Sequence, residues 1–331
     1  MWPFRRRAAG RVERLDIDPA QGDPEATRLI AAAKRGDWRA AAEFLRGVEH
    51  PDDRSFYCRV LGEHAGGGSG GGAWIDEWIA AETGPGRATA LTVKGQHAIA
   101  WAWQARGNGR ASTVSEEAFK LFFRRLKVAE DCLDDATELD ADDPTPWAGL
   151  VTLGRARQVG VAETRRRFDE AVRRYPWHRD AHSQLLQQLC RKWSGSHELM
   201  HEFAESAAAA APPGSPLGVL VADAHIEHWL DLPEGEDGEY MRSPEVGERL
   251  RLAADRSVRH PRYERRPGWA AGDNAFAMAF TLNGDRPAAA ERFDALGNRV
   301  TRWPWSYMAV PDVAYTRARL LAREHAYVDR G

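Results

Sequence analysis

The sequence is short of several features that mark common protein classes. Only five of its 46 basic residues are lysines, and the formal net charge is −3, so nothing at the level of the whole chain indicates a nucleic-acid partner. The three cysteines are far apart, which favours free thiols in a reducing cytoplasm. No apolar run approaches the roughly 20 residues of a membrane-spanning helix. We therefore expect a cytoplasmic protein without a membrane span.

What the sequence does contain is a spacing of 35 residues that recurs in two helical registers. The first register comprises Leu133, Phe168 and Phe203, and the second comprises Leu150, Leu185 and Leu220. A period near 34 residues is typical of stacked helical hairpins, and tetratricopeptide (TPR) repeats are closest in length. No stretch alternates with period two for long enough to indicate a sheet. The prediction is an all-α fold, an α-α superhelix or TPR-like solenoid of stacked antiparallel helix hairpins.

The predicted domain organisation is one solenoid over residues 23–331, preceded by a flexible tail at 1–22. A Gly-rich loop at 65–72 and an acidic loop at 231–243 interrupt the helical pattern. The helices are expected at 26–33, 38–48, 51–64, 73–82, 87–106, 115–139, 145–158, 162–174, 179–192, 197–210, 216–230, 244–259, 269–282, 286–300 and 311–326.

The sharpest local motif is His-Glu-Leu-Met-His at residues 197–201, which matches the H-E-x-x-H signature of zinc peptidases. On a helix His197 and His201 share a face, and Glu198 is then placed to polarise a zinc-bound water. Candidates for a third ligand lie on the next predicted helix, at His225, Glu227 and His228. In the alternative interpretation Ser196 caps the helix, and the negative charge of Glu198 interacts favourably with the positive end of the helix dipole. We adopt this second interpretation, which predicts no catalytic residue, no metal and no cofactor.

The repeat register also predicts a binding groove. In TPR arrays, chosen positions of each first helix face a concave surface, and these positions include Arg155, Gln187, Arg191 and His225. Such side chains together suit a carboxylate or a peptide terminus. An ordinary hydrated groove without a dedicated ligand is the alternative.

Two stretches, residues 102–117 and 192–200, resemble an uncharacterised bacterial domain-of-unknown-function family with TPR-like helices. The resemblance covers most of residues 25–300. It implies the fold far more than an activity, since that family has no established one. It also implies that several residues of the two motifs serve one shared feature, either a pocket or a structural clasp. These residues are Trp103, Arg106, Arg110, Lys192, Trp193, His197 and Glu198.

Taken together, these patterns predict a non-catalytic helical-repeat scaffold that binds a protein or peptide partner in a concave groove. Two alternatives stay open. One is a zinc-dependent hydrolase that uses His197, Glu198 and His201. The other is a small-molecule binding protein with a pocket between the Trp103 and Trp193 motifs. Neither the identity of the partner nor the oligomeric state follows from the sequence.

Overall fold

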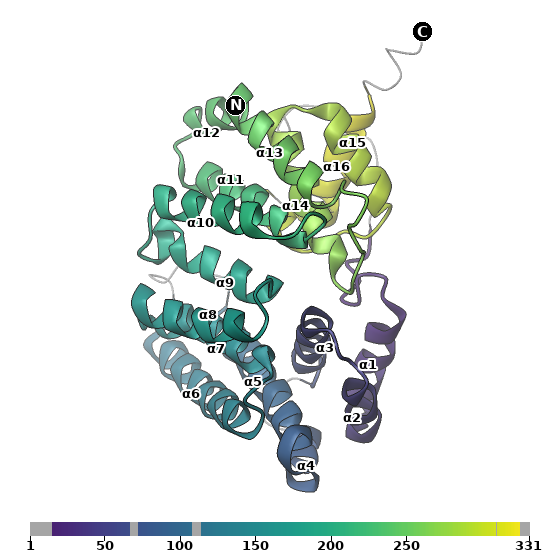
Figure 1. The fold of residues 1–331 in the computed structure, drawn as a ribbon, viewed down its shortest axis with the longest axis vertical. Coiled ribbons are helices and arrows are strands. Elements are labelled where there is room, and N and C mark those ends of the chain that lie inside the picture. Colours follow the sequence, from purple (N-terminus) through teal and green to yellow (C-terminus); the bar gives the residue numbers. More distant parts are fainter. Residues whose placement is uncertain (1–14, 67–71, 108–113, 309, 325–331) are drawn as a thin grey trace. The chain divides into compact units, whose positions relative to one another are not determined.

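The computed structural model describes residues 15–66, 72–107, 114–308 and 310–324. Over these ranges the chain forms sixteen α-helices and no β-strand (Figure 1), so the predicted all-α class is confirmed. None of these helices is both long and apolar enough to cross a lipid bilayer.

The chain divides into two compact units. The N-terminal unit is Asp23–Gln188, and the C-terminal unit runs from Leu189 onward and includes the short segment before Asp23. Three predicted features fall wholly or partly outside the described residues: Arg110, positions 67–71 of the Gly-rich loop, and positions 1–14 of the tail.

The N-terminal unit contains the first nine helices (Figure 1). They are α1 (Pro24–Arg35), α2 (Trp38–Arg46), α3 (Pro51–Glu63), α4 (Ala73–Ala81), α5 (Gly84–Arg106), α6 (Glu116–Leu139), α7 (Pro144–Arg157), α8 (Val161–Arg174) and α9 (Arg179–Leu189). The longest pair, α5 and α6, packs together, and α6, α7 and α8 follow as successive neighbours.

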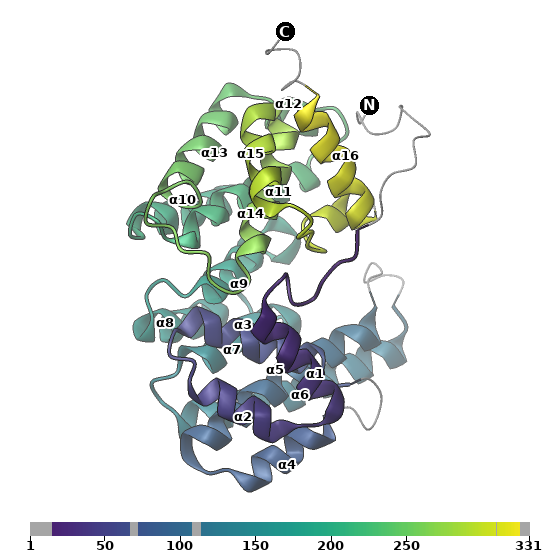
Figure 2. The ribbon, with the colours of Figure 1, turned by 90° about the vertical axis from the view of Figure 1, so that its right-hand side faces the viewer.

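The C-terminal unit contains the other seven helices, and α14, α15 and α16 lie side by side in it (Figure 2). They are α10 (His197–Ala210), α11 (Val219–Asp231), α12 (Glu236–Met241), α13 (Pro244–Arg256), α14 (Trp269–Asn283), α15 (Arg286–Leu296) and α16 (Pro311–Arg323). Three short 3-10 helices occur here as well: η3 (Arg191–Trp193), η4 (Pro216–Gly218) and η5 (Trp305–Tyr307). Helix α11 contacts α10, α12, α13 and α14 and is therefore central to the unit.

Several predicted boundaries need correction. The acidic segment 231–243 is not only a loop, because α12 forms within it. The predicted helix at 179–192 ends at Leu189, and η3 follows. Part of the predicted flexible tail is packed: Leu15 and Ala20 are buried, and the Asp18 carboxylate accepts hydrogen bonds from two backbone N–H groups of its own turn.

The core between α5, α6 and α7 depends on a close fit around Leu133. This side chain is fully buried on α6. A Cβ atom built on Gly95 of α5 would lie 2.6 Å from it, and one built on Gly149 of α7 would lie 2.9 Å from it. Glycine at both positions therefore provides the space that Leu133 fills, which is the close packing expected of a protein interior.

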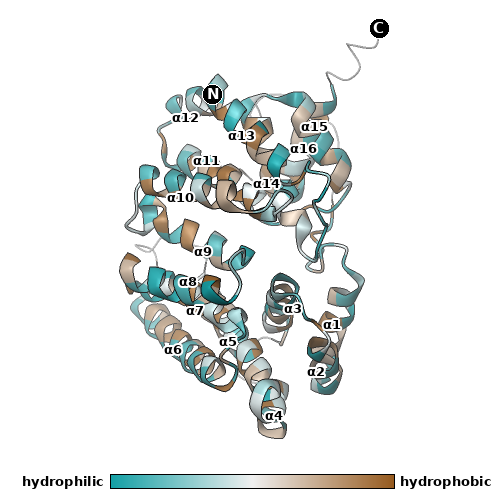
Figure 3. Ribbon diagram, in the orientation of Figure 1, coloured by the Kyte–Doolittle hydropathy of each residue, from teal (hydrophilic) through white to brown (hydrophobic). Residues whose placement is uncertain are grey.

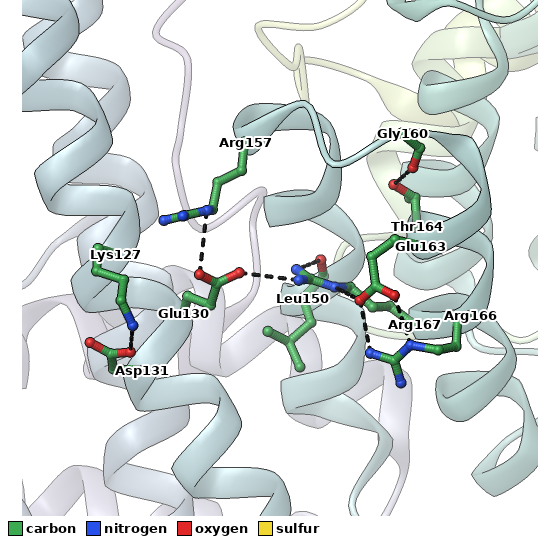
Figure 4. Close-up of polar contacts among 10 residues, drawn as sticks. All are labelled: Lys127, Glu130, Asp131, Leu150, Arg157, Gly160, Glu163, Thr164, Arg166 and Arg167. Carbon is green, nitrogen blue, oxygen red and sulfur yellow. Dashed lines mark hydrogen bonds and ion pairs between the residues drawn. The ribbon is translucent and has the colours of Figure 1, made fainter.

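A polar network joins α6 to α7 and α8 near this core (Figure 4). The Glu130 carboxylate accepts from Arg167 Nη2 at 3.1 Å and pairs with Arg157 Nε at 3.3 Å. Arg167 also donates to the Leu150 carbonyl at 3.1 Å. Helix α8 is largely hydrophilic along its length (Figure 3), so Arg167 secures a helix that contributes few apolar side chains.

The two repeat registers differ in how completely their residues are buried. All members of the second register, Leu150, Leu185 and Leu220, are almost completely buried. In the first register Leu133 and Phe168 are buried, but Phe203 is only half-buried. On α10 the buried positions are Met200 and Ala204, so the buried face is rotated relative to the predicted one.

Candidate functional site

Helix α11 carries three acidic residues at four-residue intervals, Asp223, Glu227 and Asp231. This spacing places them on one face of the helix. Asp223 and Glu227 are buried, with 6% and 4% of their surface exposed, whereas Asp231 at the end of the helix is exposed. Buried acids are rare unless they are paired or protonated. The partners of these three acids therefore decide how the centre of the C-terminal unit is stabilised.

Glu227 is held by two groups from distant parts of the chain. Lys192 Nζ donates to its Oε2 at 2.5 Å, and the Tyr307 hydroxyl donates to its Oε1 at 2.9 Å. Lys192 Nζ also lies 3.4 Å from the Tyr307 hydroxyl oxygen. The burial of Tyr307 and the negative charge of Glu227 raise the pKa of this phenol above its ordinary value. Tyr307 therefore acts as a hydrogen-bond donor to a charged carboxylate.

Asp231 contacts two further residues of the predicted site, Arg191 from the predicted groove and His197 from the second motif. Its Oδ2 is 3.2 Å from Arg191 Nη1 and 3.1 Å from His197 Nε2. With Lys192 on Glu227, three of the predicted site residues are thus attached to one face of α11. These contacts attach η3 and the start of α10 to that face of α11.

Asp223 has no cationic partner among the residues for which the structure gives contacts. Burial, and then the negative charge of Glu227, raises the pKa of Asp223 well above its ordinary value. Its Oδ1 is buried without a hydrogen-bond partner. Burial without a cationic partner therefore favours the protonated form of Asp223, and Lys192 balances the charge of Glu227.

A second cluster joins α10, α11 and α12 through histidines. The rings of His197 and His228 stack with centroids 3.8 Å apart. His201 Nε2 lies 3.0 Å from His228 Nδ1 and 3.2 Å from the Tyr240 hydroxyl, and that hydroxyl lies 2.6 Å from His225 Nδ1. One proton arrangement satisfies these contacts: Tyr240 donates to His225, and His201 donates toward Tyr240 and His228.

This arrangement requires neutral imidazoles as acceptors. Burial is the main cause that lowers the pKa of His201 to about 4, of His225 to about 3 and of His228 to about 4. The neighbouring histidines and Arg249 add to the effect on His201 and His225. The imidazoles of His201, His225 and His228 are therefore uncharged at neutral pH.

The geometry gives no support to zinc binding by the H-E-x-x-H motif. Glu198 is exposed, and hydrogen bonds with its own backbone and with Ser196 lower its pKa. Ser196 caps α10 through a hydrogen bond from the Leu199 N–H. Across the described ranges, no group of three or more His, Cys, Asp or Glu side chains is arranged to hold a metal ion. The motif has the geometry of the predicted helix cap.

A cavity of about 610 Å³ lies wholly within the C-terminal unit, between α11, α12, α14, α15 and α16. Its apolar lining includes Trp229, Met241, Leu282 and Leu321. Tyr307 also lines it, so the hydroxyl that is bound to Glu227 belongs to a residue of the cavity wall. A cavity of this size, lined by apolar and polar side chains together, is typical of small-ligand sites.

Some charged side chains of this wall have hydrogen-bond partners within the protein, and others do not. Asp237 accepts hydrogen bonds from the backbone N–H groups of Gly235 and Gly238, at 2.8 Å and 2.6 Å. Arg242 and Arg286 line the cavity. Within the part of the chain that the structure describes, neither guanidinium group has a carboxylate or hydrogen-bond partner.

The N-terminal unit has a cavity of about 510 Å³, and its arginines are satisfied within the protein. Arg54 Nε donates to Asp143 Oδ2 at 2.8 Å, and Arg46 pairs with Glu82 at 3.2 Å. The basic groups of this wall are therefore already engaged, unlike those of the C-terminal cavity.

The remaining predicted site residues have mixed placements. In the N-terminal unit, Trp103 packs edge-on against Phe122 with centroids 5.1 Å apart, and the Arg106 guanidinium lies 5.2 Å from the Trp103 ring. Arg155 on α7 and Gln187 on α9 are half-buried. In the C-terminal unit Trp193 is half-buried. His225, expected in an open groove, is instead 98% buried beside Tyr240.

Sequence reasoning missed Asp223, Tyr307, Arg242 and Arg286. The four-residue spacing of the acids on α11 was a usable signal for Asp223. The other three come from elements far apart in the sequence, and no local pattern marks them.

Comparison with known proteins adds no assignment: no protein-family model, curated protein or solved structure matches the chain. The resemblance to a TPR-like family therefore stays a prediction.

Proposed function

We propose that the chain is a helical binding protein whose recognition site is the cavity of the C-terminal unit. The observation that supports this best is the cavity itself, with apolar walls and two arginines that lack partners among the described residues. The volume suits one small ligand or the end of one peptide. The predicted peptide partner is proposed in the form of a peptide end. For the alternative of a small-molecule binding protein, we propose this cavity in place of the pocket predicted between the Trp103 and Trp193 motifs, because neither tryptophan lines it.

We further propose that the hairpins belong to the TPR-like class and stack as a solenoid within each unit. Support comes from the 35-residue spacing of Leu150, Leu185 and Leu220, all of them almost completely buried. A cytoplasmic location fits the three cysteines, which are free thiols.

The test is retention of a ligand by the full chain purified gently from its native source. Native mass spectrometry should show a bound small molecule or peptide on the wild type. Leu282→Trp, which places a larger side chain at the half-buried wall position, should release it. Leu252→Trp is the matched control, because Leu252 is 63% exposed on α13 and is not a wall residue. Equal retention by both variants would reject the cavity as the binding site.

A further inference from the structure

We propose that the ligand of this cavity is an amphipathic carboxylate, a molecule with one carboxylate group and an apolar body. This inference rests on the proposed function, and it names the chemistry that the cavity selects. The source of that chemistry is either a free apolar acid or the C-terminus of an apolar peptide, and the experiment below separates the two.

The two arginines supply the carboxylate site. Arg286 is half-buried at the start of α15, and Arg242 follows α12. Other arginines of the unit are already paired: Arg249 with Glu205 at 2.5 Å, and Arg251 with Asp285 at 2.9 Å. A guanidinium offers a planar fork of donors that matches a carboxylate. Arg242 is exposed and Arg286 is half-buried. Neither guanidinium has a protein partner in the described chain, so both are free to exchange water for a ligand anion.

The wall also carries two acidic residues, Asp237 and Glu234. The Asp237 carboxylate is stabilised by two backbone N–H groups of its own turn. Glu234 is exposed and accepts no such hydrogen bond in the described structure. An amphipathic amine that pairs with Glu234 is therefore the competing occupant, and the experiment includes it.

The rest of the wall suits an apolar body. Trp229 is 92% buried and Met241 is fully buried, while Leu282 is half-buried. Each methylene removed from water against such side chains should tighten binding roughly 4-fold. Affinity should therefore rise with the length of the chain until the cavity is full, and the carboxylate adds selectivity for the headgroup.

The experiment is isothermal titration of the full chain, stripped of endogenous ligand, with octanoate, octanol and octylamine. An acetylated apolar tripeptide is tested both as its free acid and as its C-terminal amide. We expect octanoate or the peptide acid to bind. Octanol, octylamine and the peptide amide should bind at least roughly 10-fold more weakly, since they lose the charge-assisted hydrogen bonds with the guanidinium groups. Binding of octanoate alone identifies a free acid as the source, and preference for the peptide acid identifies a peptide terminus.

Variants test the two arginines. Arg242→Gln and Arg286→Gln should each weaken binding of the acid by roughly 10- to 100-fold. Arg286→Lys keeps the charge but loses the fork, and it should fall between wild type and Arg286→Gln. Arg302→Gln is the matched control, an exposed arginine of the same unit that is not a wall residue, and it should bind like wild type. Circular dichroism checks that each variant is folded.

Three results would overturn the proposal: equal binding of octanol and octanoate, tighter binding of octylamine, or unchanged acid binding in both Gln variants. If Leu282→Trp still abolishes ligand retention in any of these cases, the cavity is a binding site and only the carboxylate assignment fails. If no probe binds and Leu282→Trp has no effect on retention, the proposed function fails as well.

Discussion

The α5–α7 core of the N-terminal unit and the surroundings of α11 in the C-terminal unit are stabilised in different ways. Leu133 fills a space left by glycines on two neighbouring helices, and its neighbours are apolar. Helix α11 is equally central, yet it buries Asp223, His225 and Glu227. Apolar packing needs only shape, whereas each buried polar group needs a specific partner or proton. The polar region is therefore the more sensitive one to pH, and it is the one next to the unsatisfied arginines.

The largest expected effect tests the apolar side of this comparison. Leu133→Ala should lower the free energy of unfolding of the N-terminal unit by about 3–5 kcal/mol, because the two glycines cannot close the cavity that it leaves. Denaturant titration measures this loss. Leu139→Ala on the same helix is the control, since Leu139 is 39% exposed, and it should cost less than about 1 kcal/mol. Equal losses in the two variants would contradict the close fit of Leu133 into the space left by Gly95 and Gly149.

Acidification tests the polar side. Because burial lowers the pKa values of His201, His225 and His228, their contribution to stability is present above the ordinary histidine pKa of about 6.5. It is lost as the pH falls toward about 4, with a slope of up to about 1.4 kcal/mol per pH unit for each imidazole. Half-exposed His228 should contribute less, and the carboxylate of Asp231 partly offsets the new charge.

Hydrogen exchange measured at several pH values, corrected for intrinsic rates, checks this prediction. Peptides from α10, α11 and α12 should lose protection before peptides from α5, α6 and α7. Peptides from α9 are left out of the comparison, because burial also lowers the pKa values of His178 and His182. Simultaneous loss in both regions would remove the distinction between them.

A smaller effect of opposite sign is expected from Asp223→Asn. The raised pKa of Asp223 means that its contribution to stability is present below its ordinary pKa of about 3.8 and is lost as the pH rises. The amide cannot ionise, so the variant should be more stable than wild type at pH 7 by about 1–2 kcal/mol, with a flatter pH profile above pH 4. Asp231→Asn, which loses contacts with Arg191 and His197, should not be stabilised. A destabilised Asp223→Asn would show that the carboxyl has a partner that the neutral amide cannot replace.

The smallest expected effect is a difference between two substitutions in the first repeat register, Phe168→Ala and Phe203→Ala. Phe168→Ala should destabilise its unit by about 3–4 kcal/mol, and Phe203→Ala should cost about 1 kcal/mol less because its side chain is only half-buried. Thermal unfolding of both variants measures the difference. A larger loss for Phe203→Ala would restore the predicted register on α10.

These contrasts also show which features follow from sequence. The helices and their apolar seams were predictable, because burial of Leu133 and Leu150 follows from local periodicity. The rotation of α10 was not, since it depends on how Met200 and Ala204 meet other helices. The helix at 236–241 was hidden by an acidic, Gly-containing composition that is typical of loops.

The candidate site was less predictable for a physical reason. Lys192 and His197 stood out in the sequence, but their partners Glu227 and Asp231 were fixed only by tertiary packing. Tyr307 reaches Glu227 across 80 positions of the chain. Neither Arg242 nor Arg286 belongs to a motif, and their lack of partners is visible only once neighbouring side chains are placed.

The most direct test of ligand binding in the C-terminal unit is a crystal structure of the full chain grown with octanoate. We predict electron density for the carboxylate between Arg242 and Arg286, with the alkyl chain against Trp229 and Leu282. Density for the ligand outside this cavity, or a cavity closed by its own side chains while octanoate binds in solution, would contradict it.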